Sequence, residues 1–182
     1  MEIRQAKVLD IPSIKSLADA LSVKSNGLDK KTGFYDYLLT KDQYFNRITS
    51  PFFFVAENKI GLEGFCMAYN FRFVKILREQ ESSLKGDTIS DFLNNLSEDY
   101  VYIDQLAARK PKTIGGSLAV YKLMDKTIDE TKKAGISSIL GAVAHNPWKN
   151  ISAINFAKKL GFELQQEVNS KGVILGIYKL DI

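Results

Sequence analysis

The stretch RKPKTIGGSL, residues 109–118, places positively charged side chains and a proline directly before two glycines. An apolar pattern with helical spacing follows at once, so a helix is expected to begin here. The first amide groups of a helix lack partners within the helix, and the helix dipole adds partial positive charge at that end. Because glycine has no side chain, a phosphate group can approach those amides closely. The stretch therefore has the composition of a diphosphate-binding turn.

A simpler interpretation fits the same stretch. Residues 112–117 have neither the GK[ST] ending of a P-loop nor the G-x-G-x-x-G pattern of a dinucleotide-binding turn. They could instead form an ordinary tight turn in which Ser117 caps the helix that follows. These residues alone leave the diphosphate-binding turn and the ordinary turn equally open.

Other side chains that could transfer protons or attack a substrate are few. His145 is the only histidine, and histidine exchanges protons near neutral pH, although a single loop histidine is usually just a polar surface residue. Cys66 is the only cysteine and lies in an apolar strand pattern, which favours a core position over a nucleophilic role. One cysteine and one histidine cannot build a zinc site, so no metal is expected.

The bulk composition restricts the class of protein. The 182 residues fit one domain, 1–182, with 45% hydrophobic and 25% charged residues. The net charge of +4 is too small, and the basic residues are too scattered, to indicate a nucleic-acid partner. No apolar run approaches the roughly 20 residues of a membrane helix, and the opening MEIRQAKVLD has no secretion signal. A cytoplasmic protein without a membrane partner is expected.

Hydrophobic periodicity predicts a regular order of strands and helices that must position these residues. Strands are expected at residues 2–8, 51–58, 60–71, 100–107, 137–144, 162–168 and 172–180. Helices are expected after Asp10, which resembles an N-cap, after Thr40, in two short pieces within 71–99, from the glycines to Gly135, and over 150–160. This order predicts an α/β protein with a mixed sheet and helices on both faces.

Taken together, these segments resemble the GCN5-related N-acetyltransferases. The pyrophosphate loop of that family reads Gln/Arg-x-x-Gly-x-Gly/Ala, and Lys112, Gly115 and Ser117 fall on its positions, with Lys and Ser as replacements. The family then has Asn-x-x-Ala and, after a helix, Gly-Phe; the matching residues are Asn150, Ala153, Gly161 and Phe162. The segments DIPSI and FFFVAENKIGLEGF also resemble the opening helix and central hairpin of the family, so the resemblance covers nearly the whole chain.

The resemblance implies a mostly antiparallel central sheet of about seven strands, with the fourth and fifth strands (100–107 and 137–144) splayed apart. Acetyl-coenzyme A would bind in the cleft between them. Amides around 113–117 would hold the pyrophosphate, the cations of 109–112 would offset its charge, and backbone near 106–108 would pair with the pantetheine arm. The cofactor-binding residues that follow are Leu106, Ala107, Ala108, Arg109, Lys112, Thr113, Ile114, Gly115, Gly116, Ser117, Asn150, Ala153 and Phe156.

The resemblance also implies direct acetyl transfer to a primary amine in a ternary complex. An amine with a pKa near ~10 is mostly protonated at neutral pH, so a base assists the reaction. Asp104 is the first candidate for this base, because it lies on the fourth strand and shares a face with Tyr102; the alternative is a hydrogen-bonded strand residue. Asn150 could bind the pantetheine or order a water, and it could also cap the last helix; the two roles are compatible.

One position departs from the family pattern. The tyrosine that usually protonates the leaving thiolate stands four residues before the Gly-Phe pair, and here that position is Ala157. Another group could supply the proton, solvent could supply it, or the protein could bind acyl-coenzyme A as a sensor without efficient catalysis. His145, just past the fifth strand, is a candidate for the replacement donor.

The resemblance places the acceptor opposite the cofactor, over residues 27–39 and 71–99. The long 71–99 segment exceeds an ordinary connection and could carry specificity. A small amine, an amino acid, a protein N-terminus or a lysine remains possible, as do a homodimer and a purely structural domain with a filled cleft. The candidate acceptor-binding residues are aromatic, although some could pack in the core: Phe34, Tyr35, Tyr37, Tyr102 and Trp148.

Overall fold

The computed structural model describes residues 1–22, 38–109 and 114–182. In this part of the chain, seven strands form one sheet with the order β1-β2-β3-β4-β5-β7-β6. The strands are β1 (Glu2–Gln5), β2 (Phe53–Asn58), β3 (Gly61–Asn70), β4 (Val101–Ala108), β5 (Ser138–Asn146), β6 (Glu163–Ser170) and β7 (Val173–Asp181). Neighbours are antiparallel except β4 and β5, which are parallel. The predicted mixed, mostly antiparallel sheet is confirmed.

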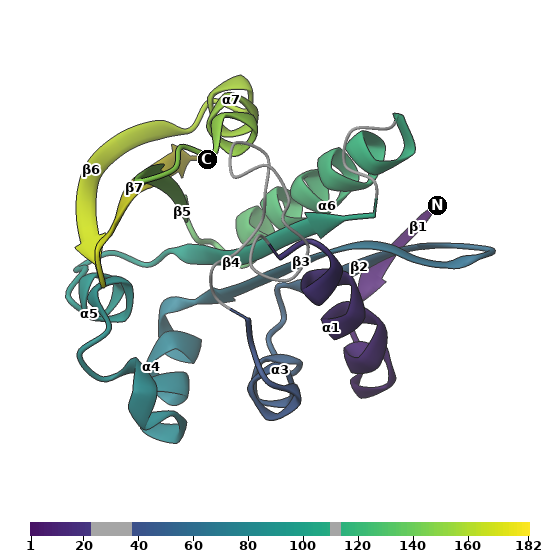
Figure 1. Ribbon diagram of the computed structural model, residues 1–182, viewed down its shortest axis with the longest axis horizontal. Helices are drawn as coiled ribbons and strands as arrows, with labels where there is room; N and C mark the ends of the chain where they lie inside the picture. Colours follow the sequence, from purple (N-terminus) through teal and green to yellow (C-terminus); the bar gives the residue numbers. More distant parts are fainter. Residues whose placement is uncertain (23–37, 110–113) are drawn as a thin grey trace.

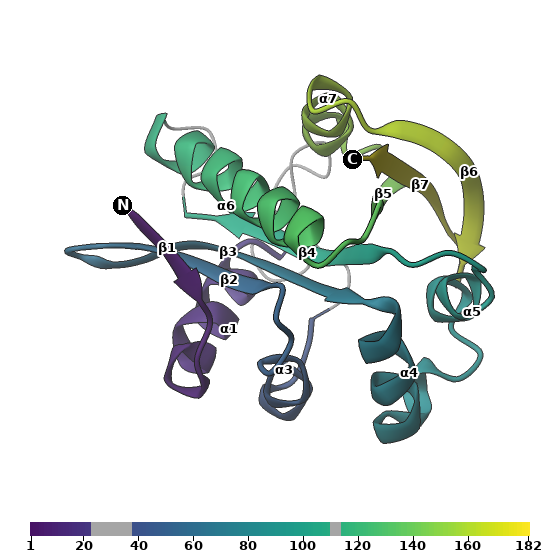
Figure 2. The same cartoon turned by 180° about the vertical axis from the view of Figure 1, so that it is seen from behind.

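Helices cover both faces of this sheet (Figures 1 and 2). The helices are α1 (Ile11–Ala20), α3 (Lys41–Arg47), α4 (Phe71–Gln80), α5 (Thr88–Asn94), α6 (Ile114–Lys133) and α7 (Ile151–Lys159), with short 3-10 turns at Val8–Asp10 and Ser82–Leu84. α1, α3 and α4 lie on one face, and α6 and α7 lie on the other. α5 contacts β6 at the far end of the sheet. The expected two-faced arrangement is therefore confirmed.

Local side-chain signals explain where several helices begin and end. Thr40 Oγ1 accepts the amide of Gln43 at 3.2 Å while the Gln43 side chain accepts the amide of Thr40 at 2.9 Å, a capping box that starts α3. Asn70 Oδ1 accepts the amide of Phe73 at 3.0 Å and starts α4. Gly135, with φ of +70°, follows the end of α6 in the left-handed conformation that glycine adopts freely. These helices were predicted, and they are confirmed.

Asp10 occupies the N-cap position of α1, as predicted, but its side chain does not cap the helix. Its carboxylate accepts the amide of Lys7 at 2.8 Å and pairs with Arg4 at 2.7 Å, and it makes no cap hydrogen bond to the described first turn of α1. The physical reason is that the 3-10 turn Val8–Asp10 precedes the helix directly, and the Arg4 guanidinium competes for the carboxylate.

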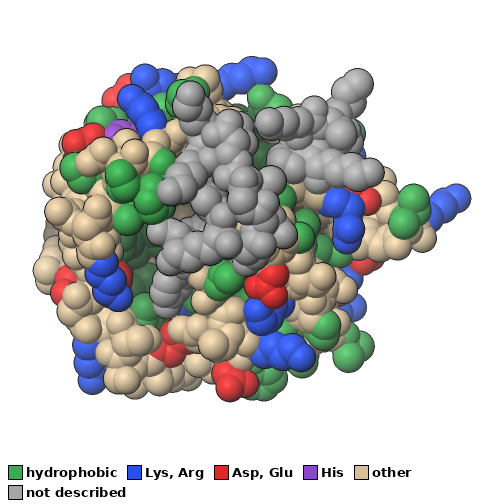
Figure 3. Space-filling view, in the orientation of Figure 1, with side chains coloured by type: hydrophobic (Ala, Val, Ile, Leu, Met, Phe, Trp, Pro, Cys, Tyr) green, Lys and Arg blue, Asp and Glu red, His purple; other side chains and the backbone are tan. Residues whose placement is uncertain are grey.

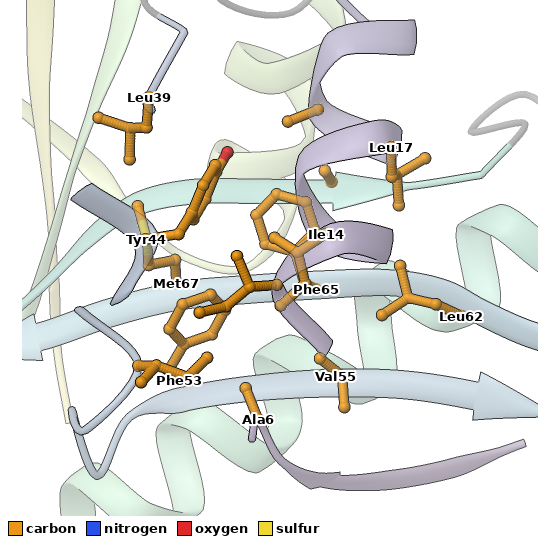
Figure 4. Packing of buried hydrophobic residues seen from close by; sticks show 14 residues of the cluster. Ala6, Ile14, Leu17, Leu39, Tyr44, Phe53, Val55, Leu62, Phe65 and Met67 are labelled. Atoms are coloured by element: carbon orange, nitrogen blue, oxygen red, sulfur yellow. The ribbon is translucent and has the colours of Figure 1, made fainter. Parts of the chain in front are cut away.

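One hydrophobic core lies between the sheet and the pair α1 and α3. Figure 4 shows side chains of α1 (Ile14 and Leu17) and α3 (Tyr44) packed against side chains of β2 (Phe53 and Val55) and β3 (Phe65 and Met67). On the opposite face, α6 packs through Ala119, Leu123 and Met124. Cys66 is fully buried there, and burial raises the pKa of its thiol to about 12. The core position predicted for Cys66 is confirmed.

Candidate active site

The sheet divides between β4 and β5. Their parallel ladder runs only from the Val101–Ile139 pair to the Ile103–Gly141 pair. Beyond it, β4 continues along β3 to Ala108, and β5 continues along β7 to Asn146. This is the predicted splay between the fourth and fifth strands, and it is confirmed.

A cavity of about 1220 Å³ opens at this splay. Its walls come from both splayed strands, from α6 and α7 on one side of the sheet, and from α4 and α5 on the other. Hydrophobic side chains gather around a hollow on the face seen in Figure 3. Ligand cavities commonly enclose roughly 300–1,000 Å³ and are mostly apolar. This cavity is therefore large enough for an extended ligand and a second, smaller one.

The predicted cofactor-binding residues divide into several groups. The ones that line the cavity are Leu106, Ser117, Asn150, Ala153 and Phe156. Ala107 and Ala108 are fully buried within β4. Arg109 donates from its Nε to the carbonyl of Leu62 at 3.2 Å, so its side chain lies beside the first residues of β3. Lys112 and Thr113 lie outside the described residues.

Helix α6 starts earlier than expected. It begins at Ile114, so Gly115 and Gly116 belong to its first turn, and the expected role of Ser117 as N-cap is wrong. First-turn residues donate no intrahelical hydrogen bond, which makes glycine tolerable there. Ser117 instead lines the cavity from the second turn. The amino-terminal end of this 20-residue helix thus lies at the cavity, as a diphosphate site requires.

Asn150 connects the end of β5 to the start of α7. Its Oδ1 accepts the amide of Ala153 at 3.0 Å, and its amide donates to the carbonyl of Ala144 at 3.0 Å. The predicted N-cap role is confirmed. Because Asn150 also lines the cavity, the predicted contact with a bound ligand stays compatible with the cap.

Asp104 lies on the other side of the splay from the helix ends. It is the extra residue of a β-bulge, since Met67 pairs with Gln105 and Ala68 pairs with Ile103. Its carboxylate lines the cavity, accepts a hydrogen bond from Tyr69 and lies 3.7 Å from Arg47 Nε. Burial raises the pKa of Asp104, although Arg47 and Tyr69 oppose this shift.

Arg47 and Glu81 form a buried ion pair beside Asp104, and the sequence analysis did not predict it. The Arg47 guanidinium contacts both carboxylate oxygens of Glu81, with Nη2 to Oε2 at 3.1 Å, and Arg47 also lines the cavity. Burial would raise the pKa of Glu81, but hydrogen bonds from Arg47 and Asn46 outweigh it and lower that pKa. Among the described residues, the buried Arg47 Nε has no hydrogen-bond partner.

One wall of the cavity comes from the long 71–99 segment. Val74 and Leu77 of α4, Leu93 of α5 and Tyr102 line the cavity together. α5 is held against the β6–β7 turn by a hydrogen bond from Thr88 Oγ1 to the carbonyl of Asn169 at 3.1 Å. Of the predicted acceptor-binding residues, Tyr102 and Trp148 line the cavity, while Phe34, Tyr35 and Tyr37 lie outside the described residues.

His145 does not line the cavity itself but contacts Tyr178, which does. Its Nδ1 lies 2.6 Å from Glu167 Oε1, and its Nε2 lies 3.0 Å from the hydroxyl of Tyr178. Tyr178 lines the cavity, as does Ala157, the position of the family tyrosine. Sequence reasoning found His145 but missed Tyr178, because a tyrosine in a buried strand pattern carries no local signal of function.

Two kinds of feature are not found in the part of the chain that the structure covers. None of its helices combines the length and apolar character needed to cross a membrane. It also brings together no group of three histidine, cysteine or acidic residues suited to a metal ion.

Comparison with known proteins links this fold to N-acetyltransferases. No protein-family model matches the chain, and no curated protein matches it in sequence. A polyamine N-acetyltransferase from Drosophila melanogaster superposes with a TM-score of 0.66 at 11% identity, covering 100% of this chain and 99% of that chain. A ribosomal-protein-alanine N-acetyltransferase from Brucella melitensis gives 0.65 at 14% identity, covering 100% of both chains. An Arabidopsis thaliana protein in complex with the bisubstrate analogue CoA-Ac-MVNAL gives 0.64 at 18% identity, covering 100% and 98%.

Proposed function

Because the chain has the fold of the GCN5-related N-acetyltransferases, we propose that it transfers an acetyl group from acetyl-coenzyme A to a primary amine. The observation that carries this proposal is the cavity at the splay of β4 and β5. The amino-terminal end of α6 lies on one side of it and the buried carboxylate of Asp104 on the other. One end suits an anion, and the other suits an amine.

The residues at the splay fit the cofactor. The first amides of α6 and the side chain of Ser117 would bind the diphosphate, and the cavity edge of β4 near Leu106 would pair with the pantetheine amides; the cavity lining supports both contacts. When bound, acetyl-coenzyme A supplies the acetyl group as a thioester. A β4 amide near Leu106 would polarise the thioester carbonyl.

On the side of the cavity opposite the amino-terminal end of α6, the protein would remove a proton from the amine. Asp104 would accept a proton from the attacking amine, and its raised pKa makes it a better base than an ordinary aspartate. Tyr69 and Arg47 hold the carboxylate in place, and Glu81 fixes the Arg47 guanidinium in turn. This arrangement supplies a positioned base without a nucleophile from the protein.

The acceptor we propose is a compact amine with an apolar body. The acceptor side is walled by apolar residues of α4 and α5, and the Thr88–Asn169 hydrogen bond ties α5 to the β6–β7 turn. Asp104 and Asp87 add negative charge to the cavity and Lys171 adds positive charge, whereas Arg47 is paired with Glu81 and lies 3.7 Å from Asp104. A screen of small amines and short peptides that reports free thiol tests this choice; peptides reacting faster than every small amine would contradict it.

Ligand binding tests the cofactor site directly. Coenzyme A should raise the melting temperature of the wild-type protein, because a ligand that binds only the folded state stabilises it. Ser117→Glu should abolish this increase, because its carboxylate repels the diphosphate while remaining favourable near a helix amino terminus. Leu118→Glu adds the same charge on an exposed neighbouring residue and should retain most of the increase. No stabilisation of the wild type at millimolar coenzyme A would refute the proposal.

A second candidate is a sensor that binds acyl-coenzyme A without efficient turnover. The observation that favours it is Ala157, which leaves the usual tyrosine position without a proton donor. Tight cofactor binding with no thiol release across the amine screen would support the sensor over the transferase.

A further inference from the structure

A chain of three hydrogen-bonding side chains ends at the wall of the cavity. Glu167 of β6, His145 of β5 and Tyr178 of β7 are joined by contacts of 2.6 Å and 3.0 Å. The imidazole is bonded through both nitrogens, and its ring meets the Tyr178 ring edge-on with centroids 5.8 Å apart. Only Tyr178 of the three lines the cavity. The chain therefore connects the outer strand β6 to the interior of the splay.

The backbone is built to seat this imidazole. His145 falls in a register shift of β5, between Ala144 and Asn146, and such bulges re-aim side chains. Gly176 lies beneath the ring, because a Cβ there would come within 2.5 Å of His145 Cε1 and Nε2. Gly176 pairs with Glu167 on one side and with Val143 on the other. A side chain at position 176 would thus displace the ring from both partners.

Tyr178 lies level with the point where the splay begins. Ile103, Gly141 and Tyr178 form one row across β4, β5 and β7, and Ile103–Gly141 is the last pair before the strands separate. A Cβ on Gly141 would meet no atom of the described residues within 4 Å, so these residues leave space beside the sheet at this row. Ala157 of α7 lines the same cavity with only a methyl group. Among the described residues of this wall, Tyr178 offers a hydroxyl donor at the row where the strands separate.

The surrounding charges keep that hydroxyl protonated. Burial, and then the negative charge of Glu167, raise the pKa of Tyr178. Among the described residues, the charged side chains that line the cavity are Arg47, Asp87, Asp104, Lys159 and Lys171. The Lys159 ammonium lies over the Tyr121 ring at 5.2 Å from the centroid. A protonated His145 would donate from Nε2 to the phenol oxygen, and the phenol proton would then point toward the cavity.

We propose that Tyr178 protonates the sulfur that leaves in the acetyl transfer, and that His145 and Glu167 resupply its proton; this inference rests on the function proposed above. The amine nitrogen bonds to the acetyl carbon, the carbon–sulfur bond breaks, and the thiolate takes the proton of Tyr178. The tyrosinate then takes a proton from His145 Nε2, and the neutral imidazole keeps its Nδ1 proton on Glu167. Solvent returns a proton to His145, whose side chain is 11% exposed. The amine proton leaves through Asp104.

Removing single groups from this chain tests it. Tyr178→Phe should lower kcat at least about 100-fold while the affinity for coenzyme A stays unchanged, since a general acid contributes about 10²–10⁴-fold. His145→Ala should lower kcat in the wild-type background but not in the Tyr178→Phe background, because it acts only through the tyrosine. Glu167→Gln should give a smaller loss, and Glu163→Gln, an exposed matched change on the same strand, should give none.

A second readout does not depend on turnover. A phenol that donates to sulfur stabilises the thiolate, so the thiol pKa of bound coenzyme A should rise by about one unit in Tyr178→Phe. Thiolate absorbance reports this pKa, with the cofactor-free protein titrated as the blank. An active wild type whose Tyr178→Phe variant keeps kcat within about twofold and the same thiol pKa overturns this inference alone. A wild type that never releases thiol overturns the proposed function, and this inference with it.

Discussion

At the scale of single residues, two candidate site residues share one backbone feature, a β-bulge. Asp104 and His145 are each the extra residue of a register shift, one in β4 and one in β5. A bulge interrupts strict alternation, so the side chain no longer has to follow the face set by its neighbours. Asp104 reaches Arg47 and Tyr69, and His145 reaches Glu167 and Tyr178. The two strands that separate therefore each present one re-aimed polar group.

Asp104→Asn should separate activity from stability. The change should lower kcat/KM by about 10²–10⁴-fold, because the base is lost while the side-chain shape is kept. In the wild type, kcat/KM should fall as the pH drops through the raised pKa of Asp104, and this acidic limb should disappear in the variant. A carboxyl whose pKa is raised on folding disfavours the folded state once it is ionised, so the variant should also unfold at a higher temperature near neutral pH.

The matched change for this experiment is Asp125→Asn on the exposed side of α6. It removes the same charge and should leave both the rate and the melting temperature unaltered. Equal activity of Asp104→Asn and wild type across the pH range would rule out the role of base.

Sequence reasoning reached only part of this residue-scale picture. Asp104 and His145 stand out because a strand carboxylate and a lone histidine are visible in the sequence. Arg47 and Glu81 form their ion pair across 34 positions, and no local pattern announces a pair that far apart. Tyr178 looks like any aromatic strand residue until β5 and β7 are placed side by side. Contacts between distant segments decide these roles.

At the scale of elements, the ends of α6 and α7 meet at the cavity. The helices themselves could be predicted from periodicity and from capping residues such as Thr40 and Asn150. The start of α6 was expected after the glycines, yet the helix includes Gly115 and Gly116 in its first turn. Glycine usually marks a helix boundary, but the first turn requires no amide donation within the helix. The helix was therefore predicted correctly, but its first residue was predicted too late in the sequence.

Asn150 is expected to serve as both a cap and a cofactor contact, and two substitutions separate the roles. Asn150→Ala removes the oxygen that accepts the Ala153 amide and should lower the free energy of unfolding by about 1 kcal/mol. Asn150→Asp keeps a cap acceptor and should be nearly neutral for stability. Urea unfolding and calorimetric titration with coenzyme A measure the two effects. Weakened coenzyme A binding in both variants indicates the second role, whereas unaltered binding in the aspartate variant would exclude it.

At the scale of the whole molecule, the cavity passes through the sheet rather than lying on one face. α6 and α7 border it on one side and α4 and α5 on the other, and only the splay joins the two halves. The order of strands and helices could be predicted because each element carries its own periodic pattern. The sequence could not predict that α4, α5 and the β6–β7 turn form one wall of the cavity, because this depends on how distant elements pack.

A cavity open to both layers predicts that cofactor and amine are bound together when the acetyl group moves. Initial rates measured while varying both substrates should give intersecting double-reciprocal lines. Acetyl-coenzyme A alone should leave the mass of the protein unchanged, because the single thiol, Cys66, is buried and its pKa is raised to about 12. Cys66→Ala should keep the wild-type kcat. Parallel lines together with a chain carrying one extra acetyl group would instead require a covalent intermediate, and the direct-transfer mechanism would have to be abandoned.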